Sequence, residues 1–301
     1  MPGSETSGTV VAAYGRRMTL LLDSGARVEA RVKGKRLQPV CGDRVYASPI
    51  SNEPDWLILR LAARRNALTR PNQRAQVEVL AANLDLLVAV CADQPQPDWF
   101  IVDRYLSAAA LMKIAAAVVY NKADTGAVAD EVAAELEQYR EIGYPALVCS
   151  ARSGYNLDAL AALLAGKTGI VAGQSGVGKS SLINALTRAD QRTAAVSTAR
   201  GEGRHTTVTA VMLPLPGGGF VVDSPGVRDY APAIANAADV AGGFPELWQH
   251  GQRCRFGNCR HRREPGCAVK AAVDDGHISE RRYESYRRLL NLTERQEQQK
   301  Y

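Results

Sequence analysis

The stretch GIVAGQSGVGKSS, residues 169–181, decides the fold of this 301-residue chain. It runs from an apolar segment of strand length, through the pattern G-x-x-x-x-G-K-S, into SSLINAL, whose apolar residues recur at helical spacing. Glycines in this pattern let backbone N–H groups turn inward around phosphate oxygens, and the helix adds its positive end. An ordinary glycine-rich turn is the alternative, and the strand–loop–helix frame argues against it. The residues predicted to bind phosphate are Gly173, Gln174, Ser175, Gly176, Val177, Gly178, Lys179, Ser180 and Ser181.

A second motif, NKAD, ends the stretch VVYNKAD at residues 118–124 and precedes the phosphate loop in the chain. It follows a buried strand directly, at the carboxyl end where open α/β sheets bind ligands. The Asp124 carboxylate matches the ring N–H and the exocyclic amine of guanine, whereas adenine presents neither donor there. Asn121 would brace the neighbouring loops, and the stem of Lys122 would cover the face of the base. The residues predicted to bind guanine are Asn121, Lys122, Ala123, Asp124 and, one strand later, Ser150 and Ala151.

A third motif, DSPG at residues 223–226, ends the apolar run FVV and predicts the magnesium side of the site. Asp223 can bind Mg²⁺ through water, and the N–H of Gly226 can meet the terminal phosphate. The hydroxyl of Ser180 can ligate the ion directly. Upstream, the stretch GEGRHTTV offers Thr206 or Thr207 as a further ligand, and the sequence does not choose between them.

The catalytic group is harder to identify from the sequence. Val227 follows DSPG at the position where many GTPases carry a glutamine that orients water, and a valine side chain cannot do so. His205 is the nearest candidate, since an imidazole can orient or deprotonate the attacking water. The alternative is an exposed loop histidine without a catalytic role.

The stretch CRFGNCRHRREPGC, residues 254–267, predicts a metal site. Three thiolates and one imidazole at this spacing suit a closed tetrahedral Zn²⁺ site, which would be structural, with one ion per chain. Unligated thiols beside a chance histidine are the alternative. The predicted ligands are Cys254, Cys259, His261 and Cys267. We expect the metal to hold the interleaved arginines Arg253, Arg255, Arg260, Arg262 and Arg263 outward, toward a phosphate backbone. The other cysteines, Cys41, Cys91 and Cys149, lie in apolar surroundings and are expected to be inert thiols.

The rest of the chain predicts three segments. Residues 8–62 read as five short strands separated by turn signals, which suggests a small barrel of OB type within residues 1–70. Between residues 71 and 235, strands alternate with helices, which favours a mostly parallel sheet covered on both faces. The strands are expected near 84–90, 114–120, 145–149 and 169–173, and the helices near 98–112, 128–143, 157–164 and 179–186. Residues 236–301 hold the cysteine-rich stretch and a final helix.

Bulk composition restricts the cellular setting. The sequence is 46% apolar and 23% charged, typical of a globular protein, and shows neither a long apolar run nor a signal peptide. We therefore expect a cytoplasmic protein without membrane contact. The net charge of +6 favours a polyanionic partner, although a solvated basic surface would look the same.

Together these motifs resemble the circularly permuted small ribosomal subunit biogenesis GTPases of bacteria. The order NKAD, Ser150-Ala151, GQSGVGKSS, GRHTT and DSPG, behind a barrel and ahead of Cys-x4-Cys-x-His-x5-Cys, carries the resemblance over nearly the whole chain. It implies an enzyme that hydrolyses GTP to GDP and phosphate with Mg²⁺, slowly alone and faster on the 30S subunit, late in 30S maturation. It also implies an OB-fold domain, a permuted P-loop GTPase domain and a zinc domain with helices, the first and last touching 16S rRNA. A histidine matching His205 is the family's proposed catalytic group.

Two other functions remain possible from the sequence. One is an RNA-binding module that nucleotide only switches, with negligible hydrolysis, which Val227 favours. The other, a P-loop kinase, would require both NKAD and DSPG to be accidents.

We expect the protein to be a monomer. The permuted order leads the chain from DSPG into the zinc segment, so we expect phosphate loss at Gly226 to shift the arginine-rich loop.

Overall fold

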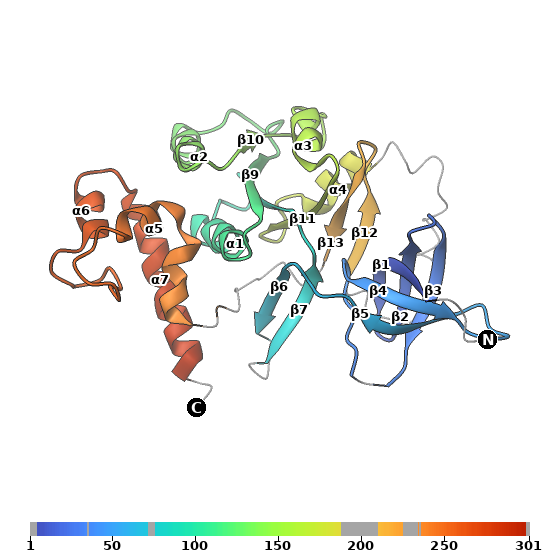
Figure 1. The fold of residues 1–301 in the computed structure, drawn as a ribbon. Coiled ribbons are helices and arrows are strands. Elements are labelled where there is room, and N and C mark those ends of the chain that lie inside the picture. Colours follow the sequence, from blue (N-terminus) through green and yellow to red (C-terminus); the bar gives the residue numbers. More distant parts are fainter. Residues whose placement is uncertain are drawn as a thin grey trace.

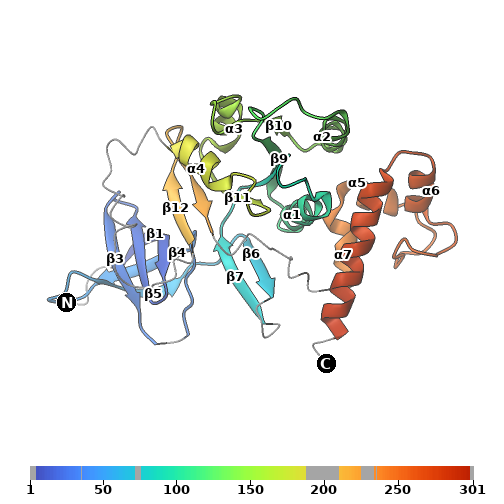
Figure 2. The same ribbon diagram turned by 180° about the vertical axis from the view of Figure 1, so that it is seen from behind.

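The computed structural model describes residues 5–34, 36–71, 76–187, 210–224, 234 and 236–298. Its three parts lie in a row, with a β-barrel at one end, an α/β sheet in the middle and a helical module at the other end (Figures 1 and 2). This is the order of parts expected from the sequence. Within the described residues, no helix combines the length and apolar character that crossing a bilayer requires.

The barrel is built from five strands, as expected. They run in the order β1-β2-β3-β5-β4, and β1 also pairs with β4, which closes the barrel. Side chains alternate along each strand, so that Val10, Leu20, Val45, Ala47 and Ile58 fill the interior. The bounds are β1 (Thr6–Tyr14), β2 (Arg17–Leu22), β3 (Arg27–Val32), β4 (Arg44–Pro49) and β5 (Trp56–Leu61).

The central sheet has the order β10-β9-β8-β11-β13-β12. Among the described strands, neighbours are parallel except β12, which forms an antiparallel hairpin with β13. Helices α1 and α2 pack with Leu87 and Ala89 on one face, and α3 and α4 pack with Leu86 and Val88 on the other. The strands are β8 (Leu86–Ala92), β9 (Ala115–Asn121), β10 (Ala146–Val148), β11 (Lys167–Gly173), β12 (Ala210–Pro214) and β13 (Gly219–Asp223). The helices are α1 (Trp99–Leu111), α2 (Asp130–Ile142), α3 (Leu157–Leu164) and α4 (Lys179–Thr187).

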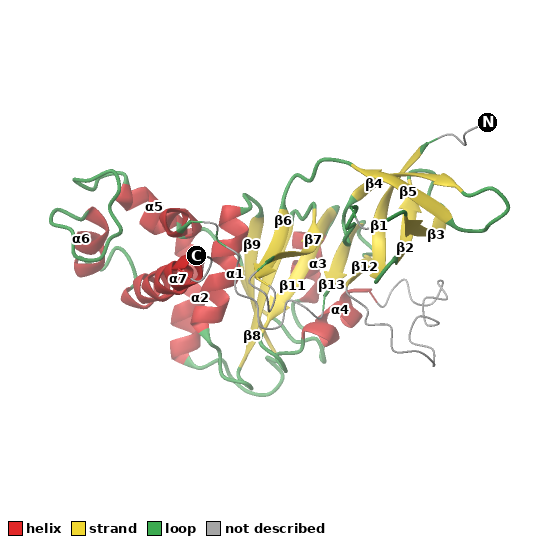
Figure 3. Ribbon diagram, turned by 90° about the horizontal axis from the view of Figure 1, so that it is seen from below, coloured by secondary structure: helices red, strands yellow, loops and turns green. Residues whose placement is uncertain are grey.

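The barrel and the central sheet share hydrogen bonds. Strand β1 pairs antiparallel with β12, with Ala12 opposite Val211 and Ala13 opposite Ala210, so the described strands of the two parts form one 11-stranded sheet. Figure 3 shows the strands running from β9 through β12 into β1. A separate hairpin, β6 (Ala67–Pro71) and β7 (Val77–Ala82), lies between them in sequence. The predicted segment boundary between residues 70 and 71 falls within β6.

The helical module consists of η3 (Ala237–Gly243), α5 (Pro245–Gly251), α6 (Ala268–Asp274) and α7 (Glu280–Gln298). Its core contains Phe244, Leu247, Val269 and, from α7, Tyr286 and Leu289. The module packs against α1 closely enough that a Cβ on Gly243 would lie 2.0 Å from Ser107 Oγ.

A buried ion network also joins the module to the central sheet. The carboxylate of Asp103, on α1, is fully buried and accepts hydrogen bonds from Arg281 Nη1 at 2.6 Å, Arg282 Nη1 at 2.7 Å and Tyr139 Oη at 2.6 Å. Burial by itself would raise the pKa of Asp103, but the charges of Arg282 and Arg281 outweigh it and hold this pKa below its ordinary value. The carboxylate is therefore ionised and compensated by the helical module.

Candidate nucleotide site and metal centre

The predicted nucleotide-binding segments meet at one edge of the central sheet. Strands β8, β9, β10, β11 and β13 are parallel, so their carboxyl ends lie at the same edge. Gly173 is in register with Val90 at this edge, and Asn121 with Ala92. The permuted order of the motifs therefore does not separate them in space.

The phosphate loop joins β11 to α4 and depends on its glycines. Gly173, Gly176 and Gly178 have φ angles of 150°, 85° and 91°, a region that glycine occupies most easily. A Cβ on Gly173 would lie 2.2 Å from the carbonyl oxygen of Val90, a contact that no side chain tolerates. Lys179 Nζ donates to the carbonyl oxygens of Gly173 at 2.7 Å and Gln174 at 2.6 Å, which holds the ammonium group against the loop.

Asn121 connects three of the predicted segments. Its Nδ2 donates to the carbonyl oxygen of Val177 in the phosphate loop at 2.9 Å, and its Oδ1 accepts from the N–H of Ala151 at 3.1 Å. The side chain is 1% exposed, so both bonds are shielded from water. A Cβ on Gly178 would lie 2.4 Å from this same Nδ2. The guanine motif and the phosphate loop are thus packed as one unit.

Asp124 is prepared as an anionic acceptor. Ser150 Oγ donates to its Oδ1 at 2.6 Å and in turn accepts from the N–H of Ser153 at 3.1 Å. The bond from Ser150 is the main reason that the pKa of Asp124 lies below its ordinary value, with a smaller contribution from the charge of Arg152. An ionised carboxylate is what the N–H groups of guanine require.

The loop between β8 and α1, which no sequence motif indicated, also borders the site. The carbonyl oxygen of Gln94 accepts from Lys122 Nζ at 2.7 Å, and Pro95 lies against Gly176. The N–H of Asp98 donates to Gln174 Oε1 at 3.2 Å. Its position in the sequence could have predicted this role, because the loop follows the carboxyl end of a parallel strand, where open α/β sheets bind ligands.

The magnesium side of the site is described only in part. Asp223 ends β13, the strand directly beside β11, and Ser180 is exposed on the first turn of α4. The predicted residues His205, Thr206, Thr207 and Gly226 lie outside the described residues, as does Val227. Their roles stay predictions.

The four predicted metal ligands converge in the helical module. Their donor atoms all lie within 4.8 Å of one another. Cys254 Sγ and Cys267 Sγ each lie 3.5 Å from His261 Nδ1, and the two sulfur atoms are 4.0 Å apart. Tetrahedral coordination, with zinc–ligand bonds of about 2.3 Å to sulfur and about 2.0 Å to nitrogen, would place sulfur about 3.5 Å from nitrogen and the two sulfur atoms about 3.8 Å apart. The cluster can therefore hold a metal ion, and its dimensions match a closed tetrahedral site.

The arginines between the ligands differ in exposure, which corrects one expectation. Arg253, Arg255 and Arg263 are exposed, whereas Arg260 and Arg262 are half-buried. Arg262 Nη2 donates to Asn291 Oδ1 at 2.6 Å and to Glu294 Oε2 at 2.8 Å, both on α7. The expectation that all five point outward was wrong for these two: α7 passes beside the loop and offers acceptors to Arg262, and Arg260 Nη1 is buried with no hydrogen-bond partner in the described part of the chain. Cys41, Cys91 and Cys149 are buried, and burial raises their pKa values to about 12, 12 and 11.

Comparison with known proteins agrees with this geometry. Residues 61–232 match the family model described as RsgA GTPase. The chain is 40% identical to the small ribosomal subunit biogenesis GTPase RsgA of Azotobacter vinelandii, over 96% of this chain and 86% of that protein. It is 39% identical to the protein of the same name from Pseudomonas aeruginosa, with the same coverage.

Two solved structures share the fold. The crystal structure of YjeQ from Thermotoga maritima superposes with a TM-score of 0.77 at 29% identity, covering 96% of this chain and 99% of that one. The crystal structure of YloQ, described as a circularly permuted GTPase, superposes with a TM-score of 0.75 at 26% identity, covering 97% and 96%.

Proposed function

This chain belongs to the RsgA GTPase family and is a GTPase of ribosome biogenesis, and we propose that it hydrolyses GTP to GDP and phosphate when it meets the 30S subunit. The observation that carries the proposal is the pair of hydrogen bonds at the Asn121 side chain, one donated to Val177 and one accepted from Ala151. They join the guanine motif to the phosphate loop and to Ala151, so these three segments lie together although the chain order is permuted.

We assign the binding and orientation of GTP to described residues. The ionised carboxylate of Asp124 accepts from the guanine N–H groups, and Ser150 holds that carboxylate in place. The loop from Gly173 to Gly178 turns its backbone N–H groups toward the β- and γ-phosphates, and Lys179 exchanges its two carbonyl partners for phosphate oxygens.

Ser180 and Asp223 would hold Mg²⁺, with Thr206 or Thr207 as a further ligand. The ion, when bound, neutralises charge on the β- and γ-phosphate oxygens. We assign His205 to orient or deprotonate the attacking water, and the N–H of Gly226 to sense the γ-phosphate.

The helical module and the barrel are proposed to contact 16S rRNA. Support comes from the relatives, which are small ribosomal subunit biogenesis GTPases, from the net charge of +6 and from exposed arginines beside the metal cluster. We propose that the cluster holds one structural Zn²⁺, and that the protein acts as a cytoplasmic monomer late in 30S maturation.

The competing proposal is a nucleotide-switched RNA-binding module with negligible hydrolysis, which Val227 favours. Turnover of GTP with no ribosome, with 30S subunits and with 50S subunits separates the two. We expect slow turnover alone and faster turnover with 30S only. Equal rates in all three conditions would refute the 30S assignment.

Guanine recognition is tested separately with Asp124→Asn. The amide replaces one acceptor by a donor, so we expect affinity for GTP to fall and affinity for xanthosine triphosphate, which presents a carbonyl there, to rise. Asp158→Asn, on the first turn of α3, is the matched control and should bind both nucleotides like the wild type. An unchanged GTP preference in Asp124→Asn would remove Asp124 from the site.

A further inference from the structure

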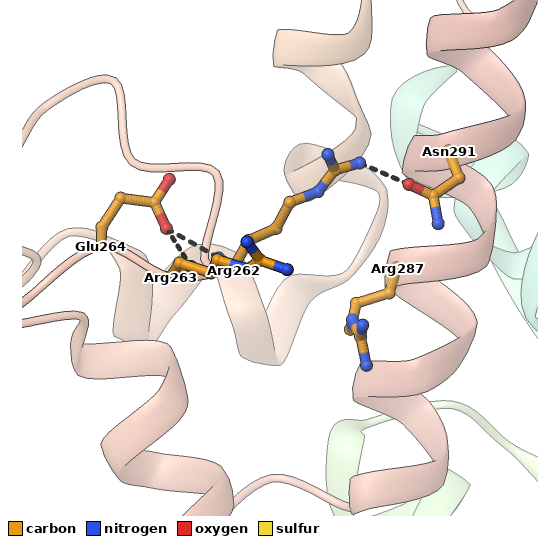
Figure 4. A pocket seen from close by; sticks show the side chains of 5 residues that line it. All are labelled: Arg262, Arg263, Glu264, Arg287 and Asn291. Atoms are coloured by element: carbon orange, nitrogen blue, oxygen red, sulfur yellow. Dashed lines mark hydrogen bonds between the residues drawn. The ribbon is translucent and has the colours of Figure 1, made fainter.

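A cleft of about 630 Å³ lies between the metal-binding loop, residues 254–267, and α7. Its lining is Arg262, Arg263, Glu264, Arg287 and Asn291 (Figure 4). Three of these five side chains are guanidinium groups, and they come from two elements that meet only in the folded protein. The cleft is distinct from the nucleotide site, which lies at the edge of the central sheet.

The loop side of the cleft is held rigidly. Tyr283 Oη donates to the carbonyl oxygen of His261, and Tyr286 Oη donates to that of Arg260 at 2.9 Å. The carboxylate of Glu264 accepts from the N–H groups of Arg260 and Arg262, both at 2.7 Å, and of Arg263 at 3.0 Å. Its negative charge is thus directed to the loop backbone. The loop is fixed to α7 before any ligand arrives.

The guanidinium groups differ in how far they are already used. Arg262 is bonded to Asn291 and Glu294, so it forms the wall of the cleft. Arg287 pairs with Glu284 at 3.0 Å, but both side chains are about half exposed, and an ion pair of this kind contributes little. The side chain of Arg263 is exposed and has no hydrogen bond or ion pair within the described part of the chain. In Figure 4 it extends toward α7.

Asn291 supplies a further donor. Its Oδ1 accepts from Arg262, which assigns the other amide atom as Nδ2, and Figure 4 shows that atom turned toward Arg287. The cleft thus offers two available guanidinium groups and an amide N–H₂ around one space. A phosphate group, with several acceptor oxygens and a negative charge, is the ligand that this set of donors fits.

We infer that this cleft binds one phosphate group of the RNA backbone, held by Arg263 from the metal-binding loop and by Arg287 and Asn291 from α7. The inference rests on the proposed contact with 16S rRNA and specifies where in the helical module it occurs. Because Arg263 stands two residues after the metal ligand His261, the metal cluster positions one half of the cleft and α7 the other.

The test uses the full-length holoprotein and three variants. Arg263→Gln and Arg287→Gln each remove one charge, and the double variant removes both. Arg295→Gln is the matched control, since Arg295 is an exposed arginine on α7 outside the cleft. Metal content and thermal midpoint are measured for each protein, so that a folding defect is recognised. Arg287→Gln changes a residue of α7 and none of the metal-binding loop itself, which keeps the test valid if the loop variants lose metal.

Affinity for purified 16S rRNA is then measured across a range of salt concentrations. We expect the double variant to bind on the order of tenfold more weakly, with the slope of log affinity against log salt reduced by about one. Arg295→Gln should lose less than about twofold. GTP turnover without ribosomes should be unchanged in every variant.

The outcomes separate this inference from the proposed function. If 30S subunits accelerate the wild type while the double variant binds rRNA like the control, the cleft assignment is overturned and the function stands. If the double variant loses acceleration by 30S but keeps its rRNA affinity, the occupant is an acidic protein segment and the RNA assignment is wrong. If wild-type protein fails to bind rRNA, the inference and the rRNA contact both fall.

Discussion

The buried ion network between α1 and α7 allows the sharpest quantitative prediction. Asp103→Asn keeps the shape of the side chain and removes its charge, which leaves Arg282 without its main compensation inside the interface. Arg282 is 0% exposed, so water cannot solvate the stranded charge. Removing one partner from a buried ion pair costs about 3–5 kcal/mol.

The structure places the expected cost at the lower end of that range. Arg281 keeps Glu135 at 2.7 Å and Arg282 keeps Glu246 at 2.8 Å, so neither arginine loses all its acceptors. We therefore expect Asp103→Asn to lower the free energy of unfolding by about 3 kcal/mol. The matched control, Glu53→Gln, breaks the exposed pair with Arg31, whose side chains are 42% and 46% exposed, and should cost no more than about 1 kcal/mol.

Urea denaturation followed by tryptophan fluorescence measures both variants. Trp99 reports on this interface, because its ring lies 5.9 Å from the Arg281 guanidinium and 6.0 Å from the ring of Tyr139. Hydrogen exchange should show the loss of protection concentrated in α1 and α7. If Asp103→Asn is no less stable than Glu53→Gln, the argument that this charge is buried and required would be refuted.

Three further predictions concern the stability in acid, the buried thiols and the phosphate loop. The pKa of Asp103 is held below the usual value of about 3.9, so the ionised carboxylate contributes its full stabilisation above about pH 5. This stabilisation is lost as the pH falls through the folded-state pKa. The unfolding curves of wild type and Asp103→Asn should therefore converge in acid. The raised pKa values of Cys41 and Cys91, about 12, make these thiols inert, so iodoacetamide at neutral pH should label only the metal-cluster cysteines, and only after chelation; fast labelling of the native holoprotein would contradict this. Gly178→Ala places a Cβ 2.4 Å from the Asn121 amide nitrogen, so GTP affinity measured by calorimetry should fall more than tenfold while the metal content stays constant; unchanged affinity would show that the loop can move aside.

Local patterns carried most of what the sequence could reveal. The phosphate loop, NKAD and the cysteine cluster are each contiguous, and their chemistry depends on residue type and spacing over a few positions. The five barrel strands and the helices of the central sheet follow from apolar periodicity, which is also local. The helix expected over 98–112 is α1, Trp99–Leu111, and the one expected over 157–164 is α3, Leu157–Leu164.

Tertiary structure decided what depends on residues far apart in the chain. The pairing of β1 with β12 is made by the backbone groups of Ala12 and Ala13. Residues of any type carry such groups, so no side-chain pattern predicts this pairing. Asp103 and Arg282, 179 positions apart, look like solvated helix charges, and only their mutual neutralisation allows both to be buried. The cleft beside the metal cluster also depends on residues far apart in the chain. Its arginines can be identified from the sequence, but the direction in which each side chain points depends on where α7 passes.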